Sequence, residues 1–301
     1  MTPAASSGSR TDGDARAWTS ALGRVAVAVI AAIMIAAVMA FLMLPIIALV
    51  TYEPLHTLIH NFGTSVATDA IRVSLKTNAI AFVLMILFGT PFAYVLGRSR
   101  FRGRSVVLTL VELPLVMPPA VAGIALLVAF GPLGLLGGTL STLGIANPVF
   151  RQAAVVMCIL FVASPFYLRG AIAAFEAVDD TFLDVAGTLG AGWLRRLLRV
   201  AVPLASSGLG AAAAVAFARG IGEFGATILF AGSFQGTTQT LPLAVYFDFS
   251  GDNIDAAVAI GVLLLAVSAA ILLTSKLLAR IWTSSTSTSP SRDGRSIYAP
   301  S

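Results

Sequence analysis

Charged residues are scarce in this chain, and their scarcity excludes most soluble proteins. Only 11% of the 301 residues are charged, while 57% are hydrophobic. A soluble domain carries about 25% charged residues. Runs of about 20 apolar residues are therefore interpreted as helices that cross a lipid bilayer. The composition predicts an all-α integral membrane protein.

Cysteine and histidine are nearly absent as well. The single cysteine, Cys158, excludes an intramolecular disulfide and lies in an apolar run, where it is interpreted as a small buried hydrophobe. The two histidines, His56 and His60, are four residues apart but have no third ligand nearby. They are interpreted as part of a solvated connection. We expect no metal and no cofactor.

The sequence also lacks the motifs of soluble catalysis. There is no G-x-x-x-x-G-K-[ST], so the chain is not expected to bind ATP through a P-loop. There is no H-E-x-x-H, no Cys-x-x-Cys and no G-x-S-x-G. Within the apolar runs, Glu112, Arg219 and Glu223 are interpreted as the deep ionisable groups. The absence of these catalytic motifs argues against an enzyme.

Six apolar runs are present, and together they predict a membrane-spanning domain over residues 24–282. The predicted spans are residues 25–50, 74–96, 105–130, 152–175, 204–231 and 254–281. The first run is too long for the roughly 7–15 residues of a signal peptide core, so we interpret it as a retained span. Pro114, Pro118 and Pro119 predict a broken or bent third span. Residues 1–23 and 283–301 are predicted to be disordered tails.

The basic residues indicate how the spans are oriented. The outer loops hold Arg72, Lys76 and Arg151, and Arg219 lies within the fifth span. The inner segments carry the other 15 of the 19 basic residues when Arg169, in the inner part of the fourth span, is counted with them. This asymmetry predicts that both termini and residues 176–203 are cytoplasmic. The same rule explains the arginine-rich loop at 98–104 better than binding of nucleic acid does.

Residues 176–203 interrupt the apolar pattern with an amphipathic helix–turn–helix that does not cross the membrane. On the first helix Val178, Phe182, Val185 and Leu189 share one face, at steps of four, three and four. The second helix has an apolar side and a basic side. The apolar side carries Trp193, Leu194, Leu197 and Leu198, and the basic side carries Arg195, Arg196 and Arg199. Such a helix pair fits a groove in a partner. The alternative is a helix that lies on the lipid surface.

The spacing of this segment resembles the coupling loop of ABC importer permeases. Asp184-Val185-Ala186, three residues, Gly190, nine residues and Val200-Ala201-Val202-Pro203 follow the family's Glu-Ala-Ala, three residues, Gly, nine residues, Ile, any residue, Leu-Pro. The departures conserve charge or apolarity. The resemblance implies docking to a separate ATPase subunit through Asp184, Val185, Ala186, Gly190, Arg195, Arg196 and Pro203. Gly190 would allow the turn, and Pro203 would stop the second helix.

A second resemblance concerns the substrate. Residues 220–227 (GIGEFGAT), then Ala231-Gly232 and the 238–246 stretch (TQTLPLAVY) look like the permease of molybdate importers. Sulfate permeases tend toward a Gly-Glu-Tyr-Gly-Ser version of the first block. The resemblance covers about residues 70–280. It implies two permease copies, two ATPase copies and an extracytoplasmic molybdate-binding protein, in the bacterial cytoplasmic membrane and without nucleic acid. Sulfate or tungstate transport is the alternative within the class; a membrane enzyme, an assembly factor or a secondary transporter are alternatives from other classes.

The fifth span supplies the candidates for the pore. Arg219 and Glu223 are four residues apart and can pair, and ionisable groups in spans usually face the bundle interior. Our hypothesis is that this pair helps to set the outer gate, together with Phe224, Gly225 and Thr227. A purely structural ion pair and direct contact of Arg219 with the substrate are the alternatives.

Overall fold

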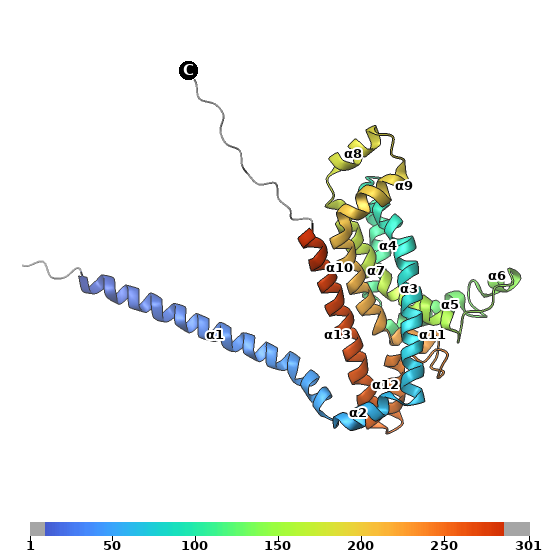
Figure 1. Cartoon of the computed structure of the whole chain (residues 1–301), viewed down its shortest axis with the longest axis horizontal. Helices are drawn as coiled ribbons and strands as arrows, with labels where there is room; N and C mark the ends of the chain where they lie inside the picture. The colour runs from blue at the N-terminus through green and yellow to red at the C-terminus, as the bar shows by residue number, and fades with distance from the viewer. Residues whose placement is uncertain (1–9, 286–301) are drawn as a thin grey trace, which may run out of the picture. The chain divides into compact units, whose positions relative to one another are not determined.

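Every regular element in the described part of the chain, residues 10–285 of this computed structural model, is helical (Figure 1). The helices in chain order are α1 (Arg10–Thr51), α2 (Leu55–Phe62), α3 (Ser65–Arg98), α4 (Arg104–Val116), α5 (Pro119–Phe130), α6 (Gly137–Thr142), α7 (Gln152–Glu176), α8 (Asp180–Thr188), α9 (Trp193–Arg196), the π-helical turn η1 (Leu197–Ala201), α10 (Val202–Ile221), α11 (Gly225–Phe230), α12 (Leu241–Ser250) and α13 (Ile254–Ser285). Five described helices are long and apolar enough to cross a membrane, or six if the bent pair α4–α5 is one span.

Helix α1 belongs to a unit of its own, Met1–Pro54. Its apolar stretch Val27–Thr51 is long enough to span a bilayer, and none of it is buried within the chain. The helix begins at Arg10, so the described part of the predicted disordered tail continues α1. Alanine, which favours helices, occurs three times there, at Ala15, Ala17 and Ala21. Residues 1–9 and 286–301 of the two predicted tails lie outside the described residues.

Helix α7 is at the centre of the second unit and packs against α3 and α10. Small residues repeat at four-residue spacing on both faces of the α7–α10 contact. A Cβ atom at Gly170 would lie 2.6 Å from the Cβ of Ala212, and one at Gly208 would lie 2.6 Å from the Cβ of Ala174. The backbones of α7 and α10 therefore approach as closely as small-residue helix pairs in membranes do.

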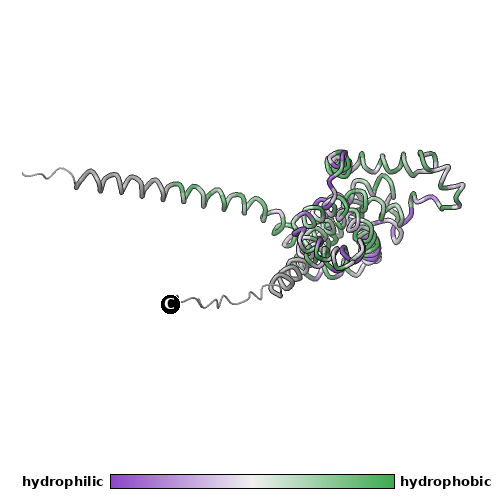
Figure 2. Tube along the Cα trace, turned by 90° about the horizontal axis from the view of Figure 1, so that it is seen from above, coloured by the Kyte–Doolittle hydropathy of each residue, from purple (hydrophilic) through white to green (hydrophobic). Residues whose placement is uncertain are grey.

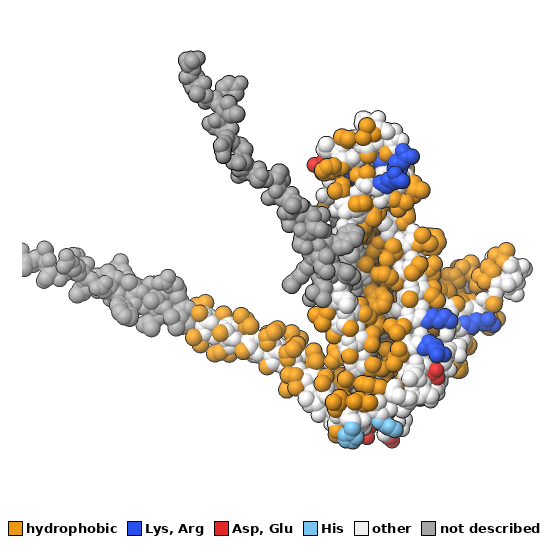
Figure 3. All heavy atoms as spheres, viewed as in Figure 1, with side chains coloured by type: hydrophobic (Ala, Val, Ile, Leu, Met, Phe, Trp, Pro, Cys, Tyr) orange, Lys and Arg blue, Asp and Glu red, His pale blue; other side chains and the backbone are white. Residues whose placement is uncertain are grey.

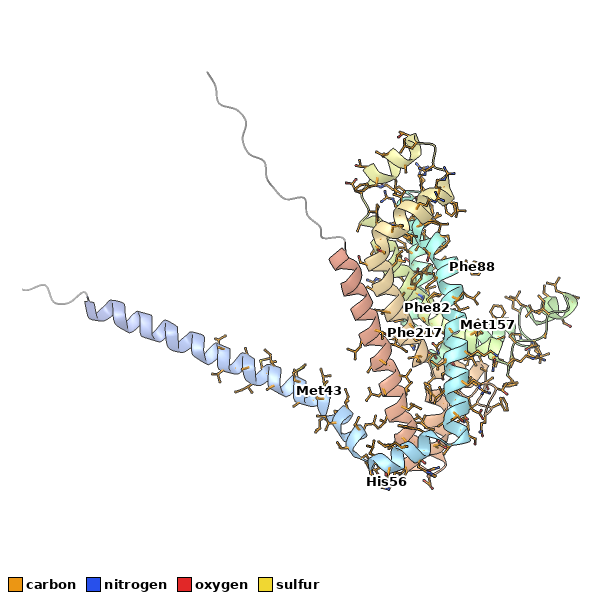
Figure 4. All side chains as sticks on the ribbon, in the orientation of Figure 1. Met43, His56, Phe82, Phe88, Met157 and Phe217 are labelled. Atoms are coloured by element: carbon orange, nitrogen blue, oxygen red, sulfur yellow. The ribbon has the colours of Figure 1, made fainter. Side chains whose placement is uncertain are left out.

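Aromatic and aliphatic contacts hold the remaining helices to this centre. The rings of Phe82 on α3 and Phe217 on α10 meet edge to face at 5.3 Å (Figure 4). A smaller buried cluster joins α3, α12 and α13 through Ala67, Leu241 and Ile260. Hydrophobic residues predominate along the helices in Figure 2. The bundle thus has an apolar core and flanks suited to lipid.

Two of the predicted spans are divided. Helices α4 and α5 are bent by 114° at a break after Val116, as the three prolines predict. The predicted span 204–231 is helical only to Ile221; the chain then breaks at 222–224 before α11. Gly220, Gly222 and Gly225 are poor helix formers, which explains this break. The predicted outer loop 232–254 contains a further helix, α12.

Candidate functional site

The segment predicted to couple to a partner forms α8, a turn and α9. The carboxylate of Asp179 accepts a hydrogen bond from the backbone N–H of Thr181, at 2.9 Å, and so caps the N-terminus of α8. This backbone hydrogen bond stabilises the ionised form and lowers the pKa of Asp179 below its usual value. The turn follows at Gly190, whose φ of 79° is left-handed, as the predicted tight turn requires.

Large apolar side chains of this segment are exposed. Leu183 and Leu197 are buried against the bundle, and Val178 joins them. The exposed large apolar side chains are those of Phe182, Val185, Leu189, Trp193, Leu194 and Leu198, which we call the apolar stripe. Figure 3 shows basic side chains gathered at the same α8–α9 end. An exposed apolar surface of this kind, rimmed by charge, is typical of a protein-binding site.

The structure places the predicted coupling residues on both sides of this turn. Asp184, Val185 and Arg195 are exposed, whereas Ala186 and Arg196 are half-buried. The backbone N–H of Ala191 donates to the carbonyl of Ala186, at 2.9 Å, and closes the turn.

Pro203 does not stop the second helix of the segment, contrary to the sequence-based expectation. Helices α9, η1 and α10 follow one another without a break, and Pro203 lies in the first turn of α10. The preceding turn is π-helical, with the N–H of Val202 donating to the carbonyl of Leu197. Because proline has no N–H and clashes with the preceding turn, widening that turn lets the helix continue.

Two arginines tie the base of this segment to the loop between α3 and α4. Arg98 donates to the carbonyl oxygens of Val178, at 2.8 Å, and Phe175, at 3.3 Å, and forms an ion pair with Asp180. Arg104 donates to the carbonyl of Leu96, at 2.8 Å, and forms an ion pair with the carboxylate of Glu176. We call Arg98, Arg104 and these partners the arginine latch.

The sequence offered no sign of the latch. The latch contacts that reach residues 175–180 join positions 72 to 82 residues apart, and the positive-inside rule already accounted for the arginines of the 98–104 loop. The rule and the latch are compatible, because one arginine can bind carbonyl groups as well as influence orientation.

The predicted pair in the fifth span is formed. Arg219 Nη2 lies 2.9 Å from Glu223 Oε2, and the Glu223 side chain is only 1% exposed, against 29% for Arg219. Glu223 lies just beyond the end of α10, where its Oε1 accepts the N–H of Ala226 at 2.8 Å. The carboxylate therefore both neutralises Arg219 and caps α11.

The other candidates of the fifth span surround this carboxylate. Phe224 stacks at a tilt on Tyr246, with ring centroids 5.2 Å apart, and Thr227 is fully buried. A Cβ atom at Gly225 would lie 2.6 Å from the Cβ of Pro119, and one at Gly123 would lie 2.7 Å from the carbonyl oxygen of Ala226. The breaks of the third and fifth spans thus meet, in direct contact through glycine.

The Thr-Gln-Thr run that marked the second resemblance has a packing role. Thr238, Gln239 and Thr240 are buried, and the Thr238 hydroxyl accepts the N–H of Phe234 at 3.0 Å. The next N–H, of Leu241, donates to the hydroxyl of Ser74 on α3 at 2.8 Å. The run holds the connection between α11 and α12 against α3. No group of three or more potential metal ligands occurs among the described residues.

Comparisons with known proteins agree with this architecture. Residues 89–281 match the family described as "Binding-protein-dependent transport system inner membrane component". The molybdenum transport system permease protein ModB of Mycobacterium tuberculosis is 45% identical over 210 residues, which cover 70% of this chain and 79% of that protein. The protein of the same name from Escherichia coli K12 is 36% identical over 178 residues, or 59% of this chain and 78% of that protein.

Solved structures show the same fold at low sequence identity. A chain of a bacterial alginate ABC transporter, in complex with a periplasmic protein bound to an alginate pentasaccharide, matches with a TM-score of 0.72 at 18% identity, covering 89% of this chain and 98% of that one. A chain of the inward-facing MetNI methionine ABC transporter matches with a TM-score of 0.56 at 17% identity, covering 72% and 96%. This chain is a multi-pass protein of the cytoplasmic membrane that belongs to the family of binding-protein-dependent transport system inner membrane components.

Proposed function

We propose that this chain is the transmembrane permease subunit of an ATP-driven importer for molybdate. The observation that carries the proposal is the 45% identity to a protein named as a molybdenum transport permease, over 79% of that protein's length. The chain itself has no P-loop, so the energy must come from another subunit. Tungstate or sulfate is the alternative anion, since all three are tetrahedral oxyanions of the same charge.

The partners follow from the same proposal. A separate ATPase subunit binds the apolar stripe, an extracytoplasmic molybdate-binding protein delivers the anion, and a second permease copy completes the path, with two ATPase copies in all. Both termini and residues 176–203 are cytoplasmic. Closure of the ATPases on ATP moves segment 176–203 and turns the spans from inward-facing to outward-facing, and hydrolysis resets them. Docking of an amphipathic helix pair in a groove supports this role.

The Arg219–Glu223 pair is proposed to help set the outer gate. The burial of Glu223 and its cap on α11 support this role, because a change in the pairing of Arg219 would alter the charge balance at the meeting point of both broken spans. Phe224, Gly225 and Thr227 belong to the same gate. A purely structural ion pair remains the competing interpretation.

Charge placed in the apolar stripe tests the docking surface. Val185→Asp should abolish copurification of the ATPase subunit, because an unpaired carboxylate in an apolar contact costs several kcal/mol, and 1.4 kcal/mol is already tenfold in affinity. Val185→Leu is the control at the same position, since it keeps an apolar side chain in the stripe. Equal retention of the ATPase by both variants would contradict the docking assignment.

The substrate is tested in vesicles that contain the permease, the ATPase and the binding protein. Molybdate-loaded binding protein should stimulate ATP hydrolysis and anion uptake more than sulfate-loaded or tungstate-loaded protein. Preference for sulfate or tungstate would replace molybdate as the substrate and leave the permease role intact. Uptake that follows an ion gradient and ignores ATP would overturn the importer class.

A further inference from the structure

A second charged pair lies inside the spans, between α4 and α7. Glu112 Oε1 on α4 lies 3.7 Å from Arg169 Nε on α7, and the two helices pack against each other. Arg104 is the first residue of α4 and Glu176 the last residue of α7. Glu112 and Arg169 both lie about two helical turns, or about 11 Å, deeper than these end residues.

Both side chains of this pair are open to their surroundings. Arg169 is 72% exposed and Glu112 is 47% exposed, and α4 has no buried residue among its 13. A charged residue at such depth is costly in lipid, and a loose exposed pair returns little of that cost. Charged residues in spans face a protein interior or a water-filled cavity. This face of α4 and α7 is therefore assigned to an aqueous path.

A hollow of about 320 Å³ lies along the same face. Arg104 and Glu176 lie at one end and Glu112 and Arg169 at the other, with Leu108 and Ile172 on the walls between them. The hollow runs along the open face of α4 and α7, from the arginine latch to the Glu112–Arg169 pair.

Arg169 differs from the other arginines of this region in how it is held. Arg104 is tied to Leu96 and Glu176, and Arg219 is held at 2.9 Å by the buried Glu223. Arg169 meets Glu112 through Nε at 3.7 Å, and no hydrogen bond to its two terminal nitrogens is present among the described residues. The outer fork of its guanidinium is therefore open, and a guanidinium fork matches the oxygens of a tetrahedral oxyanion.

We propose that Arg169 is an oxyanion contact in the inner half of the translocation path, and that Glu112 is its competing counter-ion. The passing anion replaces Glu112 at the guanidinium, and Glu112 returns when the anion leaves. This competition keeps the site weak, and conduction needs binding that is strong enough to admit an ion and weak enough to release it. The assignment rests on the proposed function as an oxyanion importer.

Uptake of molybdate by vesicles with the complete complex tests the assignment. Arg169→Gln should slow uptake by about tenfold or more, as expected when a charge-assisted contact to the anion is lost. ATP hydrolysis stimulated by loaded binding protein should stay within about twofold of wild type, so that fewer anions cross per ATP. Arg169→Lys should keep part of the rate. Arg102→Gln, an exposed arginine of the cytoplasmic loop, is the control and should transport normally.

The double variant Glu112→Gln/Arg169→Gln separates an anion contact from a structural pair, because it leaves no unpaired charge. We expect it to remain about as slow as Arg169→Gln, since the contact is still missing. Recovery of uptake in the double variant, or wild-type uptake by Arg169→Gln, overturns the assignment. Absence of uptake by the wild-type complex, with ATP and loaded binding protein, would instead contradict the proposed function itself.

Discussion

Replacing Arg98 should destabilise the base of α8 much more than replacing Asp180, its partner in one ion pair of the arginine latch. Arg98 is 15% exposed and donates to two backbone carbonyl oxygens, whereas Asp180 is 81% exposed. Hydrogen bonds from a charged group are worth about 1.5–3 kcal/mol, but an exposed ion pair is worth only about 0.2–1 kcal/mol. Arg98→Ala should therefore cost about 2–4 kcal/mol in the local stability of the α8 base, and Asp180→Asn at most about 1 kcal/mol.

Hydrogen exchange of the amides in residues 176–190 measures this local stability. A loss of 2 kcal/mol raises exchange about 30-fold, whereas a loss of 1 kcal/mol raises it about fivefold. We expect exchange to rise at least about 30-fold for Arg98→Ala and at most about fivefold for Asp180→Asn. The exposed control Arg102→Ala should leave exchange unchanged. Arg98→Lys should lie between Arg98→Ala and Asp180→Asn, because an ammonium cannot bind both carbonyl oxygens in a planar fork.

Two outcomes would refute this reasoning about the latch. If Asp180→Asn raised exchange as much as Arg98→Ala, the ion pair and not the carbonyl bonds would hold the segment. If Arg98→Ala left exchange unchanged, the α8 base would be held by apolar packing of Val178 and Leu183. In either case the ATPase should still copurify, since the apolar stripe is untouched, so docking and positioning are measured separately.

Two further predictions concern the meeting point of the broken spans. Gly225→Ala should lower the melting temperature of the purified permease, because its Cβ atom would lie 2.6 Å from Pro119 and overpacking costs about 1–3 kcal/mol; Gly210→Ala, where no atom lies within 4 Å, should be neutral or stabilising by up to about 1 kcal/mol. A loss of stability at both positions would show that the α5–α11 contact is not special. Glu223→Gln keeps an acceptor for the N–H of Ala226 but removes the charge that faces Arg219. It should slow uptake about tenfold in an assembled complex, which corresponds to a coupling energy of about 1.4 kcal/mol between the pair and transport. Normal uptake at normal expression would exclude a gating role.

Local spacing made part of the site predictable. The Arg219–Glu223 pair follows from a four-residue step, and the left-handed turn follows from Gly190 between two amphipathic stretches. The all-helical membrane fold and the bend of the third span follow from apolar runs and prolines. These features depend on residues that are near one another along the chain, so pattern and propensity determine them.

Contacts between distant residues were not predictable in this way. The long-range contacts of the latch join residues 72 to 82 positions apart, and the Glu112–Arg169 pair depends on how α4 lies on α7. The sequence identified Glu112 as an ionisable residue deep in a span. It did not identify Arg169, because one sequence does not show which arginine faces Glu112. The prediction that Pro203 stops the second helix was wrong because a proline can either end a helix or lie in its first turn. Here the π-helical turn before Pro203 lets the helix continue.

The packing order explains why the latch matters beyond the loop that it holds. Arg104 is both a latch residue and the first residue of α4, α4 leads through the 114° bend into α5, and α5 touches α11 through Gly123 and Gly225. At these glycines the backbones of α5 and α11 are in direct contact. A small shift of one helix therefore displaces the other. In the proposed mechanism, a movement of segment 176–203 reaches the surroundings of Glu223 along this route through Arg104, which binds both Glu176 and the carbonyl of Leu96. Variation at the latch should therefore separate ATP hydrolysis from transport, whereas variation in the apolar stripe should remove both.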